Sequence, residues 1–93
     1  MEITEVRVAL RNEERLKGYA TITFDNCFVV RNIRIVQGQK GIMVCMPSRK
    51  LSDGTHRDVA HPINNDFRYK IEDKVLAAYN DELKKGSQQG SNT

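Results

Sequence analysis

The sequence predicts an α+β domain, in which a four-stranded antiparallel sheet is followed by a long basic loop and one C-terminal helix packed on the sheet. Apolar and polar residues alternate along segments of the first half, and short polar connectors separate these segments, as in a meander. After residue 63 the apolar residues recur at helical spacing instead. A chain of 93 residues without internal repeats forms one domain, which we expect to span residues 1–85, followed by a disordered polar tail at residues 86–93.

Two alternating segments predict the first pair of strands. Residues 2–11 alternate in part, as a half-buried strand does, and the glycine-ended connector at residues 12–18 favours a hairpin. Residues 19–24 alternate strictly and lead into Asp25-Asn26, a candidate two-residue turn. The side chains predicted to face inward from the second strand are Ala20, Ile22 and Phe24.

The third predicted strand, residues 27–36, changes its apolar parity part-way. Its apolar residues share one parity up to Val30 and the other parity from Ile33 onward. One extra residue near Arg31-Asn32, a β-bulge, would place them all on one face. The alternative is a strand that is buried on both faces. A glycine-flanked turn then leads to an apolar run at residues 42–46, which predicts the fourth strand.

A long loop, residues 47–63, joins the fourth strand to the helix. Pro47 has no N–H to give to a sheet ladder and therefore ends the strand. Asp53-Gly54 predicts a turn, because glycine reaches positive φ without strain, and His61-Pro62 disfavours helix at the exit. A strand and a proline thus hold a polar, basic loop, and loops held in this way often carry function.

The C-terminal helix is expected to begin after an asparagine N-cap, either Asn64 or Asn65. Asp66 follows and complements the positive end of the helix dipole. Gly86 predicts the end of the helix. The apolar stripe that would pack on the sheet consists of Phe67, Ile71, Val75, Ala78 and Tyr79.

Composition places the chain among ordinary soluble globular proteins, with 29% charged residues and a net charge of +3. It has no apolar run near the length of a membrane span and no signal-peptide pattern, so we expect a cytoplasmic protein without membrane contact. Cys27 and Cys45 lie in apolar strand patterns and predict two buried, reduced thiols. The small core of so short a chain favours at least a homodimer.

Basic residues of the loop are the main candidates for a binding site. Arg49 and Lys50 follow Ser48, and Arg57 lies across the predicted turn, so a folded-back loop would bring these cations together. Guanidinium and ammonium groups beside the hydroxyls of Ser48 and Ser52 suit the oxygens of a phosphate. A solvated loop with surface charges is the plainer alternative.

Three further residues, Asp58, His61 and Arg68, are expected to anchor the loop. Arg68 projects into the apolar arc of the helix, so we expect Asp58, a carbonyl or Glu72 to pair with it; an anion contact is the functional alternative. His61, like His56, fits a structural histidine better than a metal ligand or an acid–base group. The sequence contains no nucleophile–base pair, phosphate-binding glycine loop or carboxylate dyad, so we predict no enzyme, metal or cofactor.

The segment from Met46 to Ile63, which reads M-P-S-R-K, then D-G, then R-D-V-A-H-P-I, resembles the signature of the stage V sporulation protein G family, also called the septation regulator family. The resemblance extends from Met1 to about Leu83. It implies the same kind of fold, a dimer, and a regulator linked to septation in cell division and to sporulation. It also implies binding of DNA, and of RNA, in which basic residues of this loop take part.

Residue by residue, Arg49 and Lys50 match the basic pair that follows Met-Pro-Ser in the family, and Arg57 matches the basic position before Asp58. Phe67 departs from the pattern, in which a polar residue is expected. On this basis we predict a nucleic-acid-binding regulator in which three loop cations per subunit, doubled in a dimer, neutralise roughly six phosphates.

A protein–protein interaction module is the main alternative, because an exposed sheet edge can pair with a strand of a protein partner.

Further residues could add to the nucleic-acid site. Arg7, Arg31 and Arg34 would extend the basic face if they project outward, which depends on the bulge. Tyr19, Tyr69 and Tyr79 could stack on bases, but each fits a place in the core or at its rim better.

Overall fold

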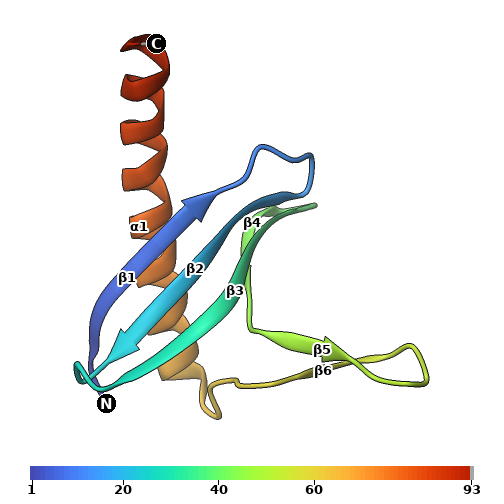
Figure 1. Cartoon of the computed structure of the whole chain (residues 1–93). Coiled ribbons are helices and arrows are strands. Elements are labelled where there is room, and N and C mark those ends of the chain that lie inside the picture. The colour runs from blue at the N-terminus through green and yellow to red at the C-terminus, as the bar shows by residue number, and fades with distance from the viewer. Residues whose placement is uncertain (93) are drawn as a thin grey trace.

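The computed structural model describes the backbone of residues 1–92 and the side chains of residues 1–85. Four antiparallel strands in the order β1-β2-β3-β4 form one layer, and the helix α1 crosses one face of this sheet (Figure 1). The predicted α+β meander with a C-terminal helix is therefore confirmed. The elements are β1 (Ile3–Leu10), β2 (Leu16–Phe24), β3 (Phe28–Gly38), β4 (Gly41–Cys45) and α1 (Asn65–Asn92).

The segment between β4 and α1 is a two-stranded ribbon and not an irregular loop. β5 (Ser48–Lys50) pairs antiparallel with β6 (His56–Asp58), and the ribbon projects away from the sheet and from α1 (Figure 1). The N–H of Val59 donates to the carbonyl of Pro47 at 2.7 Å and continues the ladder to the base of the ribbon. The basic residues thus lie on a regular element, and its strand register determines which face each side chain occupies.

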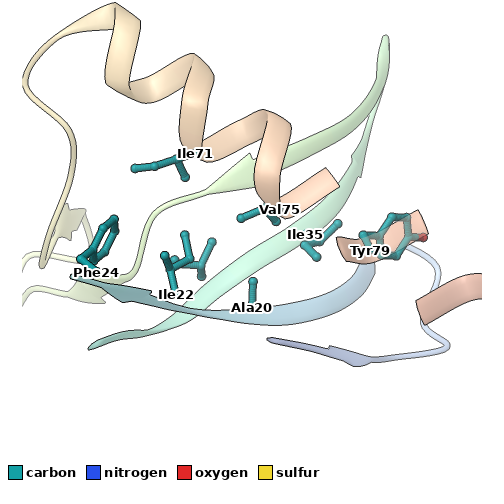
Figure 2. Packing of buried hydrophobic residues seen from close by; sticks show 8 residues of the cluster. Ala20, Ile22, Phe24, Ile35, Ile71, Val75 and Tyr79 are labelled. Carbon is teal, nitrogen blue, oxygen red and sulfur yellow. The ribbon is translucent and has the colours of Figure 1, made fainter. Parts of the chain in front are cut away.

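The core lies between α1 and the face of the sheet that we call the inner face (Figure 2). Strict alternation along β2 turns its buried side chains to this face, as predicted from the sequence. The rings of Phe24 and Phe67 lie 5.9 Å apart between their centroids and close one end of the core. The buried apolar residues are Ala20, Ile22, Phe24, Ile33, Ile35, Ile71, Val75 and Tyr79.

A β-bulge in β3 corrects the parity of its apolar residues. From Val30 to Ile33 the chain of β3 advances by three residues while its partner β2 advances by only two, so Arg31 and Asn32 share one position in the ladder. Asn32 adopts a φ of 64°, in the left-handed region that asparagine tolerates better than most residues. The predicted bulge is confirmed, and Val30 and Ile33 both face the core.

The predicted turn at Asp25-Asn26 is also present. Both residues have positive φ, at 51° and 55°, and the N–H of Cys27 donates to the carbonyl of Phe24 at 3.0 Å, as in a type I′ hairpin turn. The N–H of Glu2 donates to Asp25 Oδ1 at 2.8 Å. The start of the chain therefore braces the turn between β2 and β3.

The two cysteines are less buried than the sequence predicts. Cys27 is exposed because it follows this turn, and Cys45 is half-buried opposite Arg34, on the face of the sheet that does not carry α1. Both are free thiols. The prediction of two buried thiols is therefore wrong for Cys27 and holds only in part for Cys45.

The helix α1 begins with the predicted N-cap. Asn64 Oδ1 accepts a hydrogen bond from the N–H of Phe67 at 2.8 Å. The helix continues beyond Gly86, its predicted end, because one glycine inside a helix costs only about 1 kcal/mol relative to alanine. The predicted tail at residues 86–93 lies outside the residues whose side chains are described. Over the described residues, no helix has the length and apolar character needed to span a membrane.

The bulge generates a stability prediction. Replacing Asn32 with valine should lower the free energy of unfolding by about 1–2 kcal/mol, because a side chain branched at Cβ meets the full steric penalty of the left-handed region. Asn32→Gly, which adopts positive φ freely, should stay within about 0.5 kcal/mol of the wild type. Urea unfolding followed by circular dichroism measures both changes. Equal stabilities of the two variants would contradict the left-handed conformation at Asn32.

Candidate functional site

The register of the ribbon sorts the predicted site residues onto two faces. Directly opposite residues of an antiparallel pair point to the same side, and successive residues alternate. Arg49 pairs with Arg57, whereas Lys50 pairs with His56. The two arginines therefore share one face of the ribbon, and Lys50 lies on the other face. The three cations that the sequence predicts to converge are divided into a pair and a single lysine.

The arginine pair, Arg49 and Arg57, is exposed and has no neutralising partner among residues 1–85. Cβ atoms of directly opposite residues in such a ribbon lie about 4.5–5.5 Å apart, and like charges on directly opposite residues destabilise the pair. Within residues 1–85, ion pairs join Arg7 to Glu5 at 3.2 Å and Lys85 to Glu82 at 3.5 Å, so neither ribbon arginine has a carboxylate partner there. Two adjacent guanidinium groups without a counter-charge suit an anion such as phosphate.

The turn at the tip of the ribbon is held by its own side chains. Asp53 Oδ1 accepts hydrogen bonds from the hydroxyl of Thr55 at 2.7 Å and from its N–H at 3.0 Å. The hydrogen bond from the hydroxyl has the larger effect and the bond from the N–H the smaller, and together they lower the pKa of Asp53 below its ordinary value of 3.8. Because the folded-state pKa is lowered, this stabilisation is present above pH 3.8 and is lost as the pH falls through the lowered pKa. The turn, which includes Ser52, is thus stabilised throughout the neutral range.

A polar hollow lies between the other face of the ribbon and the outer face of the sheet, the face that does not carry α1. Its volume is about 650 Å³. Cations from three separate elements line it: Arg11 after β1, Arg34 on β3 and Lys50 on β5. The other residues that line the hollow are Ala9, Tyr19, Asn32, Ser48 and His56.

The cross-strand pairing explains how the sheet contributes to this hollow. Tyr19 on β2 pairs with Ala9 on one side and with Arg34 on the other, so the three side chains share the outer face. Arg7 pairs with Thr21 in the neighbouring position and shares that face. Arg7 and Arg34 therefore both lie on the outer face of the sheet, where Arg7 is paired with Glu5, while Arg31 belongs to the bulge.

Arg11 is a site residue that the sequence reasoning missed. Its guanidinium carbon lies 5.6 Å from the centroid of the Tyr19 ring, in a cation–π arrangement. A signal was available, because Arg11 has the same parity as Arg7 and Ala9 along the first strand. It lies just beyond the end of β1, however, and its approach to Tyr19 depends on the pairing of β1 with β2.

The three predicted anchors occupy less constrained positions than expected. Asp58 is exposed and lies opposite Ser48 at the base of the ribbon. His61 is exposed, whereas a structural histidine would be at least partly buried, and its Nδ1 lies 3.1 Å from the carbonyl oxygen of Pro62. Arg68 is half-buried, and within the described residues no hydrogen bond or ion pair links its side chain to a loop group. The anchoring role of these residues stays a prediction.

A second concavity of about 520 Å³ is apolar and lies beside the start of α1. Three apolar side chains that line it are strongly exposed, Ile63 at 91%, Met1 at 73% and Phe28 at 62%. Exposed apolar surface around a groove is typical of an interaction surface. We call this concavity the apolar groove; the residues that line it include Met1, Phe28, Met46, Ile63 and Phe67.

Comparison with known proteins agrees with the resemblance seen in the sequence. The relatives named here each carry the name "Putative septation protein SpoVG". The relative from Anaeromyxobacter dehalogenans strain 2CP-C is 53% identical over 87 residues, which cover 94% of this chain and 86% of the relative. The relative from Bdellovibrio bacteriovorus strain HD100 is 54% identical over 84 residues, covering 90% and 78%. The relative from Myxococcus xanthus strain DK1622 is 46% identical over 79 residues, covering 85% and 80%.

The family model of SpoVG matches residues 1–81, which include the whole sheet, the ribbon and the first part of α1. The match therefore covers both faces of the ribbon and the polar hollow. The chain belongs to the SpoVG family.

Proposed function

We propose that this protein is a nucleic-acid-binding regulator that acts in septation and contacts phosphates of DNA or RNA through the ribbon. The observation that carries the proposal is the exposed arginine pair, Arg49 and Arg57, in which like charges lie directly opposite each other without a carboxylate partner among residues 1–85. A bound phosphate relieves this repulsion and accepts hydrogen bonds from both guanidinium groups. The names of the relatives support the septation part of the proposal.

The basic surface continues from the ribbon to the sheet. Lys50 on the second face of the ribbon and Arg34 on β3 line the same hollow, so a nucleic-acid backbone that passes over the ribbon meets cations on both sides. Contacts of this kind bind phosphates irrespective of base sequence. With roughly six phosphates neutralised by a dimer, the slope of log affinity against log salt concentration should be about −5.

We propose further that the apolar groove is the contact between two copies of the chain. Ile63 protrudes at the margin of the groove that it also lines, so the same surface carries both a knob and a cleft. A two-fold dimer needs such self-complementarity, because each residue of the patch contacts the patch of the partner. The groove lies beside the start of α1, whereas the basic hollow lies on the outer face of the sheet, so both surfaces can be used at once.

Pairing of a protein partner along a sheet edge is the alternative role. The edges of the sheet are β1 and β4. Strand pairing is made by backbone hydrogen bonds, so the affinity for such a partner should change little when the ribbon arginines are replaced or the salt concentration is raised. Phosphate binding should respond strongly to both, and this difference separates the two functions.

Removing the arginine pair tests the phosphate contacts. The double variant Arg49→Ala/Arg57→Ala should bind a labelled DNA duplex or RNA about tenfold or more weakly than the wild type near physiological salt, with a shallower salt dependence. Fluorescence anisotropy at two salt concentrations measures both effects. Lys84→Ala/Lys85→Ala removes the same charge from exposed positions on α1 and should bind almost as the wild type. Equal loss in both double variants would mean that only net charge matters and would contradict a ribbon site.

Replacing the exposed isoleucine tests the dimer contact. Ile63→Ser should shift the protein from dimer to monomer at micromolar concentration, because a polar side chain would then be buried without a partner in the groove. Sedimentation equilibrium measures the mass directly. Met43→Ser, at an exposed position on β4, should leave the dimer intact. A monomeric wild type, or an Ile63→Ser protein that remains dimeric, would refute this interface.

A further inference from the structure

One aromatic side chain, Tyr19, lines the polar hollow. Tyr19 is half-buried on the outer face of the sheet, at the centre of a row that runs from Ala9 through Tyr19 to Arg34. Ala9 is too small to cover the neighbouring ring. The inner face of the sheet already supplies the core, so a tyrosine in this position is not needed to complete it.

Arg11 adds a second group that can stack on a base beside this ring. Its guanidinium group lies over Tyr19 at 5.6 Å from the centroid, and Arg11 itself is exposed. A guanidinium plane held on an aromatic ring can stack a nucleobase on its free side, and the ring can receive the base directly when the arginine moves aside. In either arrangement the base lies flat against a surface that the sheet holds in place.

The groups around Tyr19 and Arg11 suit the rest of a nucleotide. Arg34 and Lys50 supply positive charge for the adjoining phosphate, and no carboxylate is among the described residues that line the hollow. Side chains of Asn32, Ser48 and His56 offer hydrogen-bonding groups for a base edge or a sugar hydroxyl. The hollow thus combines stacking, charge and polar groups within about 650 Å³.

We infer that the polar hollow binds an unpaired nucleobase stacked at Tyr19 and Arg11, so that this protein prefers single-stranded nucleic acid to a duplex. A base inside a duplex is stacked on its neighbours and presents only its edges, so its flat face cannot reach these two side chains. The inference rests on the proposed nucleic-acid binding and adds the ligand class to it. Phosphate contacts by the ribbon alone would accept single strands and duplexes alike.

Variants of Tyr19 test the inference with a thymidine oligonucleotide of about twelve nucleotides and a duplex of the same length. The wild type should bind the single strand more tightly than the duplex. Tyr19→Leu should weaken single-strand binding between about fivefold and about 150-fold, the range measured for loss of one base–aromatic stack, and should leave duplex binding within about twofold. Tyr19→Phe keeps the ring and should restore single-strand binding. Tyr69→Leu, at an exposed position on α1, should behave as the wild type.

A spectroscopic readout reports stacking independently of affinity. An oligonucleotide that carries one 2-aminopurine should lose fluorescence on binding to the wild type and to Tyr19→Phe, and should lose much less on binding to Tyr19→Leu. The inference is overturned if Tyr19→Leu binds single strand and duplex as the wild type does, or weakens both equally; the proposed function then survives. Failure of the wild type to bind either ligand would overturn both the inference and the proposed function.

Discussion

The bulge at Arg31-Asn32 is the constraint on which the two faces of this sheet depend, because it decides which side each later residue of β3 occupies. With the bulge, Ile33 and Ile35 are fully buried, and burial of each such side chain contributes about 1.5–3 kcal/mol. A regular strand in register with Val30 would instead turn Arg34 into the core, where an unpaired charge is strongly unfavourable. One backbone irregularity therefore completes the core on the inner face and supplies a cation to the hollow on the outer face.

The same two-residue alternation divides the ribbon into two chemically different surfaces. Arg49 and Arg57 form the proposed anion site on one face, while Lys50 on the other face lines the hollow together with Arg34 and Arg11. The ribbon therefore has two roles in the proposed mechanism: its arginine face holds a phosphate backbone of either nucleic acid, and its lysine face lines a hollow in which a base can stack. Loss of the first role weakens all binding, whereas loss of the second changes the choice of ligand.

Local patterns predicted the elements well because most of them follow from a few neighbouring residues. Three local features can be predicted from the sequence and are present in the structure: the strict alternation of β2, the parity shift at the bulge and the cap at Asn64. The register of the ribbon could not be predicted from the sequence. It depends on which two residues form the first hydrogen bond across the turn, and in the structure this bond runs from the Leu51 N–H to the Thr55 carbonyl. The role of Arg11 depends on strand pairing across the sheet, so local spacing indicates its face but not its partner.

The measurement that tests the central claim most directly is an NMR titration of the ¹⁵N-labelled protein with a short single-stranded oligonucleotide. If the ribbon and the hollow form the nucleic-acid site, the amide shifts that change most should belong to residues 48–58 and to the strand positions around Tyr19 and Arg34, while the amides beside the apolar groove stay unchanged. Changes concentrated along the free edges of β1 and β4, or beside the groove, with unmoved ribbon amides, would contradict the account.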